Sequence, residues 1–129
     1  MTINEAMLEA EELLQGYEYT PAQTLKWLNE CEQRVWGEVL QHYEIEGLEK
    51  PPVYSDTLNG NQQLLVPDPY SKLYVHYIAA QYYYWNREYT GYANAREQYN
   101  GLLSDFAGTI TRNYKHKSNP NYTFRGVRW

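Results

Sequence analysis

Residues 64–114 read LLVPDPYSKLYVHYIAAQYYYWNREYTGYANAREQYNGLLSDFAGTITRNY. Four large aromatic residues follow one another within this stretch, namely Tyr82, Tyr83, Tyr84 and Trp85. Successive residues of an α-helix are rotated by about 100°, so these four side chains point to nearly every side of the helix. Such a helix has to be covered on several sides. Because 129 residues provide few elements for this purpose, the run predicts that a partner subunit supplies part of the cover.

The same stretch predicts two helices, at about 69–88 and 91–113. Asp68 and Pro69 suit the N-cap and the first turn of the earlier helix. The later helix has apolar residues at helical spacing, which are Tyr92, Ala95, Tyr99, Leu102, Leu103, Phe106 and Ile110. A short break at Thr90-Gly91 separates the two, which makes them an antiparallel pair.

Two further helices are expected nearer the N-terminus, at about 3–15 and 21–43. Thr2 and Glu5 have the spacing of a capping box, and Thr20-Pro21 suits the start of the second helix. The apolar stripe of that helix consists of Leu25, Leu28, Cys31 or Glu32, Val35 and Val39. A cysteine on such a stripe is expected to be buried and unreactive. The sequence therefore predicts an all-α, four-helix bundle-like domain over residues 1–114.

The segment 44–67 interrupts the helical pattern with the turn residues Pro51-Pro52 and Asn59-Gly60. An Asn-Gly pair between Val53-Tyr54 and Leu64–Val66 is compatible with a short β-hairpin. Loops of this length in small domains are often functional or interfacial. Tyr54, Asn59 and Gly60 are therefore candidate contact residues.

Charge is distributed unevenly along the chain. Residues 1–50 have a net charge of −8 and residues 51–129 a net charge of +3. The segment 115–129 lacks a helical period and is expected to be an extended basic tail. The candidate docking residues are Arg112, Lys115, Lys117, Tyr122, Phe124, Arg125, Arg128 and Trp129. An acidic front and a basic tail favour self-association or an acidic partner, whereas a pI near 5.2 argues against a domain that grips DNA.

The aromatic composition favours interfaces. Fifteen tyrosines and four tryptophans stand against two phenylalanines, and Tyr and Trp are enriched where proteins meet. The candidate packing and interface residues are Tyr74, Tyr82, Tyr83, Tyr84, Trp85 and Tyr89. A core built with Tyr in place of Phe is the simpler interpretation. A second functional hypothesis is a small-ligand or carbohydrate-binding module, which requires a concave aromatic pocket.

Catalytic motifs are absent from the sequence: it contains no Gly-rich phosphate loop, Cys/His zinc spacing or nucleophile elbow. Glu38, His42 and Glu46 are spaced to share a helix face as metal ligands, which gives a third hypothesis, but the Glu-x-x-His motif of di-iron bundles is missing. We favour a solvated polar face at these positions. We expect no cofactor and no enzymatic activity.

The sequence contains no signal for secretion or membrane insertion. Cys31 is the single cysteine, so no disulfide can form within the chain. Acidic residues interrupt any apolar signal-peptide core, and no apolar run approaches the ~20 residues that span a bilayer. We expect a soluble protein that is intracellular when synthesised.

The run Leu65–Tyr77 resembles small head–tail connector proteins of tailed phages and prophages, which are also called head-completion or neck adaptor proteins. The similarity continues through Tyr84, Asn86, Glu88, Tyr89, Tyr92, Asn94, Tyr99-Asn100 and Phe106. It also includes the opening Met1–Glu5 and the helix segment Thr24–Trp36. The resemblance covers most of residues 1–114, whereas the tail after Tyr114 has no counterpart.

This resemblance implies a structural virion protein assembled in the bacterial cytoplasm. Copies of such a protein form a ring, commonly of twelve, beneath the portal protein at the capsid vertex. The ring extends the DNA channel, through which DNA passes without sequence-specific binding, and it receives the next neck or tail-completion protein. No membrane is involved.

Overall fold

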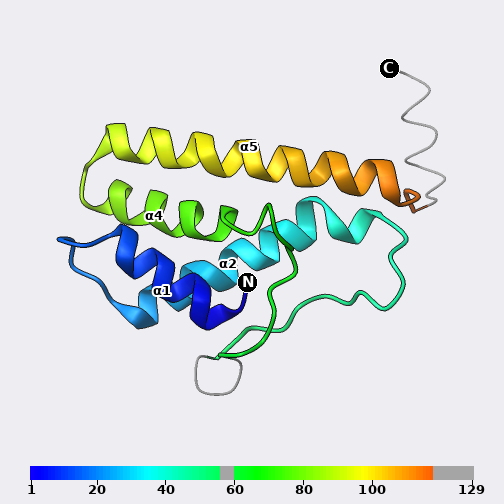
Figure 1. Ribbon diagram of the computed structural model, residues 1–129, viewed down its shortest axis with the longest axis horizontal. Coiled ribbons are helices and arrows are strands. Elements are labelled where there is room, and N and C mark those ends of the chain that lie inside the picture. Colours follow the sequence, from blue (N-terminus) through cyan, green and yellow to red (C-terminus); the bar gives the residue numbers. More distant parts are fainter. Residues whose placement is uncertain (56–59, 118–129) are drawn as a thin grey trace.

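The computed structural model describes residues 1–55 and 60–117, and these residues form an all-α domain (Figure 1). The elements in chain order are α1 (Ile3–Leu13), α2 (Pro21–Glu38), the short 3₁₀ helix η1 (Leu40–His42), α4 (Leu73–Trp85) and α5 (Tyr89–Asn113). This architecture confirms the predicted bundle-like all-α fold. No helix within the described ranges is both long and apolar enough to cross a membrane.

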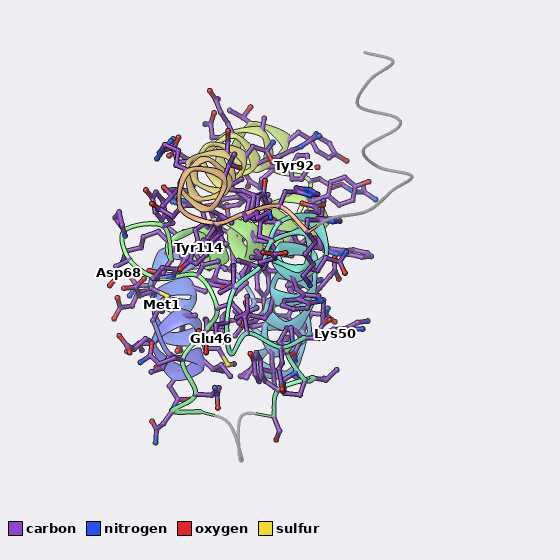
Figure 2. All side chains as sticks on the ribbon, turned by 90° about the vertical axis from the view of Figure 1, so that its right-hand side faces the viewer. Met1, Glu46, Lys50, Asp68, Tyr92 and Tyr114 are labelled. Carbon is purple, nitrogen blue, oxygen red and sulfur yellow. The ribbon has the colours of Figure 1, made fainter. Side chains whose placement is uncertain are left out.

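The helices are arranged in three levels. Figure 2 shows α5 above α4, and α1 and α2 side by side beneath α4. Helices α4 and α5 run antiparallel, as the sequence predicted (Figure 1). The buried residues of α5 are Ala95, Tyr99, Phe106 and Ile110, whose spacing places them on one face. The opposite face of this 25-residue helix is therefore open to solvent along its length.

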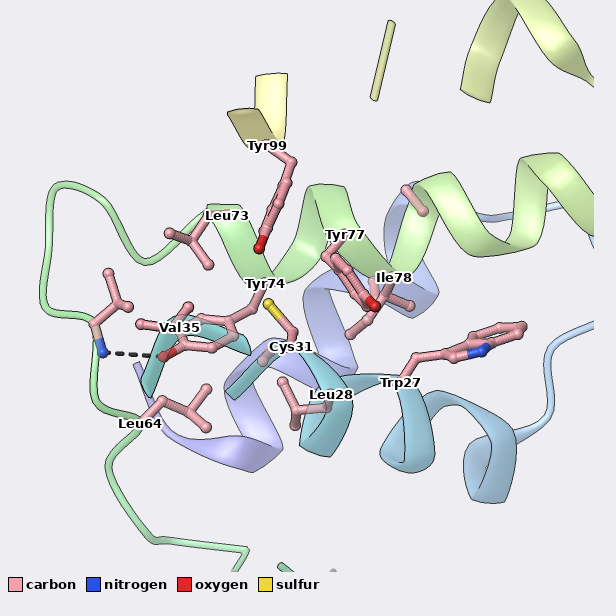
Figure 3. Packing of buried hydrophobic residues seen from close by; sticks show 14 of the residues in the cluster. Trp27, Leu28, Cys31, Val35, Leu64, Leu73, Tyr74, Tyr77, Ile78 and Tyr99 are labelled. Carbon is pink, nitrogen blue, oxygen red and sulfur yellow. Dashed lines mark hydrogen bonds between the residues drawn. The ribbon is translucent and has the colours of Figure 1, made fainter. Parts of the chain in front are cut away.

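The core lies between α4 and the pair α1 and α2. Leu28 and Val35 of α2 and Ile78 of α4 are fully buried there, and Figure 3 shows the two α2 residues beneath α4. Cys31 is also fully buried and has no disulfide partner, as expected for a small apolar residue on this stripe. The glutamate beside it, Glu32, is buried as well.

Capping at the start of α1 follows the sequence signal. The Thr2 hydroxyl accepts a hydrogen bond from the Glu5 amide at 3.1 Å, and the Glu5 carboxylate accepts one from the Thr2 amide at 3.3 Å. The start of α2 differs, because the Thr20 side chain makes no capping bond. The Thr20 amide instead donates to the Tyr82 hydroxyl at 3.1 Å. A residue 62 positions away thus satisfies the amide of the N-cap residue.

Helix α4 begins later than the proposed Asp68-Pro69 start. Its N-cap is Lys72, and the preceding residues form tight turns in which the Leu73 amide donates to the Tyr70 carbonyl at 3.1 Å. Asp68 accepts a hydrogen bond from the buried Ser71 hydroxyl. The Asp68 side chain therefore stabilises the turn instead of capping a helix.

The break between α4 and α5 also lies earlier than predicted. The chain reverses at Asn86–Glu88, where Arg87 has a positive φ of 60°, and Gly91 lies inside the first turn of α5. A Cβ atom at Gly91 would lie 3.1 Å from Cγ of Tyr83. Gly91 thus permits close helix packing, which explains a glycine that the sequence analysis interpreted as a helix break.

The proposed β-hairpin within 44–67 is not present in the described residues. The Leu64 amide donates to the Met1 carbonyl at 3.0 Å, and the Asn4 amide donates to the Gly60 carbonyl at 3.0 Å. The second arm of the expected hairpin therefore pairs with the chain around the start of α1. This alternative satisfies amides in the first turn of a helix, which have no partner within the helix.

Candidate interaction surface

The four consecutive aromatic residues at the end of α4 have different environments. Tyr82 is only 5% exposed and lies inside the domain. Its hydroxyl lies 2.6 Å from the Thr24 hydroxyl and donates to the Thr20 carbonyl at 3.1 Å. Its ring packs edge-on against Trp27, with 4.7 Å between centroids, and stacks on Tyr19 at 5.8 Å. Tyr82 thus joins α4 to the start of α2.

Tyr83 is partly buried, between the chain that follows α1 and the first turn of α5. Its ring meets the edge of Tyr17 with 5.6 Å between centroids. On its other side it approaches the backbone of Gly91. The position directly after the core tyrosine therefore also packs within the chain.

Tyr84, Trp85 and Tyr89 form an exposed group that we call the aromatic rim. Their exposed fractions are 52%, 70% and 58%. The Tyr84 ring lies 6.2 Å from Tyr89 and 5.3 Å from Tyr92, measured between centroids. The rim surrounds the turn between α4 and α5, at the left end of the pair in Figure 1. Grouped aromatic side chains in contact with water are typical of a binding surface.

Tyr74 and Tyr82 belong to the core, so their predicted role is restricted to packing within the chain. Tyr74 is fully buried. Its hydroxyl donates to Glu32 at 2.5 Å and accepts from the Val66 amide at 3.0 Å, and Figure 3 shows the latter bond. Neither side chain reaches the surface. Of the predicted packing and interface residues, those exposed to a partner are the three of the rim.

The carboxylate of Glu32 connects the segment 44–67 to the helices. It also accepts hydrogen bonds from the Tyr54 hydroxyl and the Leu65 amide, each at 3.0 Å. Burial raises the pKa of Glu32 despite the hydrogen bonds, which favour the charged form. Burial beside this carboxylate also raises the pKa of Tyr74.

Tyr54 and Gly60 were predicted as contact residues of the 44–67 segment. This prediction is wrong for a surface contact, because both residues are buried. Tyr54 is 5% exposed, and its amide donates to the Asn29 side chain at 2.7 Å. Gly60 is buried, and a Cβ atom there would lie 2.7 Å from the Asn4 side chain. Both residues fix the segment to the helices. Asn59 lies outside the described residues.

The basic residues near the end of α5 remain accessible. Arg112, Lys115 and Lys117 are exposed. The backbone around them is fixed, because the Lys115 carbonyl accepts from the Glu44 amide and the Lys117 amide donates to the His42 carbonyl, each at 2.8 Å. The folded domain therefore continues past the predicted boundary at 114. The other candidate docking residues, Tyr122, Phe124, Arg125, Arg128 and Trp129, lie outside the described part of the chain.

The metal hypothesis does not match the geometry. Helix α2 ends at Glu38, while His42 lies in η1 and Glu46 in the following loop, so the three positions do not share one helix. Glu38 is paired with Arg34 at 3.2 Å. Across residues 1–55 and 60–117, no group of three or more His, Cys, Asp or Glu side chains could hold a metal ion.

A polar cavity of about 210 Å³ lies between α2, α4 and α5. We call it the basic pocket, because Arg34 and Arg96 line it together with Tyr77, Tyr99, Gln81 and Asn100. This cavity was not predicted from the sequence. The available signal was the spacing of Tyr92, Arg96, Tyr99 and Asn100 on one face of α5, but their counterparts on α2 and α4 are distant in the sequence.

Three comparisons with known proteins found no match. No protein-family model matches the chain, and the searches of curated proteins and of solved structures found no match either.

Proposed function

We propose that this chain is a structural adaptor of a tailed-phage neck. In this proposal, copies form a ring beneath the portal protein, extend the DNA channel and receive the next neck or tail-completion protein. The observation that carries the proposal is the aromatic rim of Tyr84, Trp85 and Tyr89, which the fold leaves exposed. The resemblance of residues 1–114 to head–tail connectors supports the same function.

The rim fits an assembly role on physical grounds. Trp and Tyr dominate the binding energy of protein interfaces, because each buries a large area with few rotatable bonds. Trp85 is 70% exposed, and Tyr84 has neighbouring rings within 6.2 Å on two sides. The rim thus presents a preformed aromatic surface whose burial in an assembly is favourable by the hydrophobic effect.

The charge distribution supports a ring around DNA. A surface that joins a different surface on the next copy generates a closed ring when the rotation closes. Acidic copies, with a net charge of −5, repel phosphates and would let DNA pass. A basic lining would hold it by releasing counterions.

The small-ligand or carbohydrate hypothesis has less support. It requires exposed aromatic rings that line a concave site. The rim residues surround a helix turn, and none of them lines the basic pocket. Of the tyrosines that do line it, Tyr77 and Tyr99 are almost fully buried and Tyr92 is partly buried.

The first prediction tests the rim in the assembly. Trp85→Ser should leave the unfolding temperature unchanged, because the side chain is mostly in solvent. It should also prevent incorporation into virions. Val53→Ser is the matched control, because Val53 is an apolar residue that is 77% exposed but lies away from the rim.

Scanning calorimetry and reconstruction of phage particles would measure the two effects. A wild-type particle whose neck lacks this chain would reject the proposed function. So would a neck in which the rim touches no other subunit.

A further inference from the structure

The basic pocket has positive charge that its own lining does not neutralise. Arg34 lies with its guanidinium carbon 5.8 Å from the centre of the Tyr77 ring and is paired with Glu38. Arg96 has no ion-pair partner among the residues that the structure describes. No carboxylate lines the cavity. Two carboxylates contact the lining residues, because Glu38 pairs with Arg34 and Glu30 accepts a hydrogen bond from the Tyr77 hydroxyl. Arg96 is therefore the guanidinium of the pocket that is left to bind an anion.

The size of the pocket suits one side chain. Its volume of about 210 Å³ is below the roughly 300–1,000 Å³ of typical small-molecule sites. Guanidinium groups bind carboxylates through two parallel hydrogen bonds. The amides of Gln81 and Asn100 at the cavity wall add neutral donors. The occupant that matches this chemistry is a protruding Asp or Glu side chain.

Such side chains lie on the opposite flank of the same molecule. Figure 2 shows α1 and α2 on opposite sides beneath α4, and the pocket includes residues of α2 but none of α1. Residues 1–25 contain five glutamates and no lysine or arginine. Glu11 and Glu12 at the end of α1 are exposed, and Leu13 beside them is 47% exposed.

We propose that the end of α1 in one copy, with Glu11 and Glu12, docks at the basic pocket of the next copy. This contact rests on the proposed ring and identifies the two surfaces that would join its subunits. Because the two surfaces differ and lie on opposite flanks, each copy can bind one neighbour with each of them. Repetition of such a head-to-tail contact generates a ring when the rotation closes.

Charge reversal on each surface tests the contact. Arg96→Glu reverses the unpaired charge of the pocket, and the double variant Glu11→Lys/Glu12→Lys reverses the α1 surface. Lys26→Glu is the matched control for the pocket, because Lys26 is exposed on α2 but does not line the cavity. Glu46→Lys/Glu49→Lys is the control for α1, because it makes the same charge change on the exposed loop.

Sedimentation velocity at low salt measures self-association of each protein and of mixtures. We expect each pocket or α1 variant to associate at least about tenfold more weakly than wild type, because like charges then face each other. An equimolar mixture of the two should associate again, since it restores one native contact. Both controls should behave as wild type.

Several results would overturn this contact. These are a wild-type chain that stays monomeric at every concentration, a pocket variant that associates normally, a control that weakens association equally, and a mixture that stays monomeric. The proposed function has a separate test, because particle reconstruction locates the chain whichever surfaces join it. A chain found in the neck whose Arg96→Glu variant assembles normally would reject the pocket contact alone.

Discussion

At the scale of single residues, Glu32 is the most consequential side chain in the fold. It is fully buried, yet its carboxylate accepts hydrogen bonds from Tyr54, Leu65 and Tyr74. These bonds fix the chain before α4 against α2. A buried carboxylate with three donors is stable only while those donors remain, and the donors in turn depend on the carboxylate.

Replacement of this carboxylate gives a prediction about stability and pH. Glu32→Gln should destabilise the domain by about 1–3 kcal/mol, because one amide oxygen replaces two acceptors and the amide NH₂ faces a hydroxyl donor. Burial raises the pKa of Glu32 in the fold. The carboxyl group of Glu32 therefore stabilises the fold fully at pH values below the ordinary carboxyl pKa. This stabilisation is lost as the pH rises through the raised pKa of the folded state.

Glutamine does not titrate, so the difference in unfolding free energy between wild type and Glu32→Gln should widen as pH falls from neutral towards about 4.5. Urea denaturation at several pH values measures it. A difference that is constant with pH, or that narrows on acidification, would contradict the raised pKa.

Two buried tyrosines provide a matched pair. The Tyr74 hydroxyl bonds to Glu32 and to the Val66 amide, whereas the Tyr99 hydroxyl is buried and has no hydrogen-bond partner among the described residues. Tyr74→Phe should lower the free energy of unfolding by about 1.5–3 kcal/mol, because it removes a bond to a charged group. Tyr99→Phe should be neutral or stabilising. Equal losses in urea denaturation would refute this difference.

The sequence could place Glu32 on the apolar stripe of its helix but could not decide between it and Cys31. Helical periodicity reports which residues share a face, whereas burial of a charge depends on partners. Those partners, Tyr54 and Tyr74, lie 22 and 42 positions away. The same limit applies to Tyr82, whose exposed neighbours have identical local sequence signals. Only the tertiary arrangement determines which of the four aromatics enters the core.

At the scale of elements, the helices were predictable and their ends less so. The 3.6-residue period identified the four α-helices of residues 1–55 and 60–117 and the antiparallel pair, because a helix that packs on one face must repeat its apolar residues. The ends depend on tertiary bonds. Asp68 stabilises a turn with Ser71, and the Tyr82 hydroxyl accepts a hydrogen bond from the Thr20 amide at the start of α2. Neither contact leaves a local signal.

Gly91 and Gly101 of α5 provide a test of how closely α4 and α5 pack. A Cβ atom at Gly101 meets nothing within 4 Å, whereas one at Gly91 lies 3.1 Å from the Tyr83 ring. Gly101→Ala should stabilise the domain by about 0.5–1 kcal/mol through helix propensity. Gly91→Ala gains the same propensity but forces the Tyr83 ring to move, so it should give less stability or a loss. Thermal unfolding compares the two, and an equal gain would contradict the close approach.

At the scale of the whole molecule, the domain presents distinct surfaces in different directions. The aromatic rim surrounds the α4–α5 turn, while the exposed Lys115 and Lys117 follow the far end of α5 (Figure 1). The basic pocket and the acidic end of α1 occupy opposite flanks. A molecule with four unlike surfaces suits a position between unlike neighbours, which is the situation of an adaptor within a neck.

The basic tail gives the last prediction, in which two truncations separate folding from docking. A chain that ends at Lys117 keeps the hydrogen bonds of Lys115 and Lys117 to Glu44 and His42 and should unfold at the wild-type temperature. A chain that ends at Tyr114 loses both bonds and should be less stable by about 1–3 kcal/mol. Both should fail to join the neck, because each lacks residues 118–129, which we propose dock on the portal or a neighbouring subunit.

Calorimetry measures the stability of the two truncated chains, and particle reconstruction measures whether they join the neck. Complete necks built from the 1–117 chain would show that the docking surface lies elsewhere, and the aromatic rim would then be the remaining candidate.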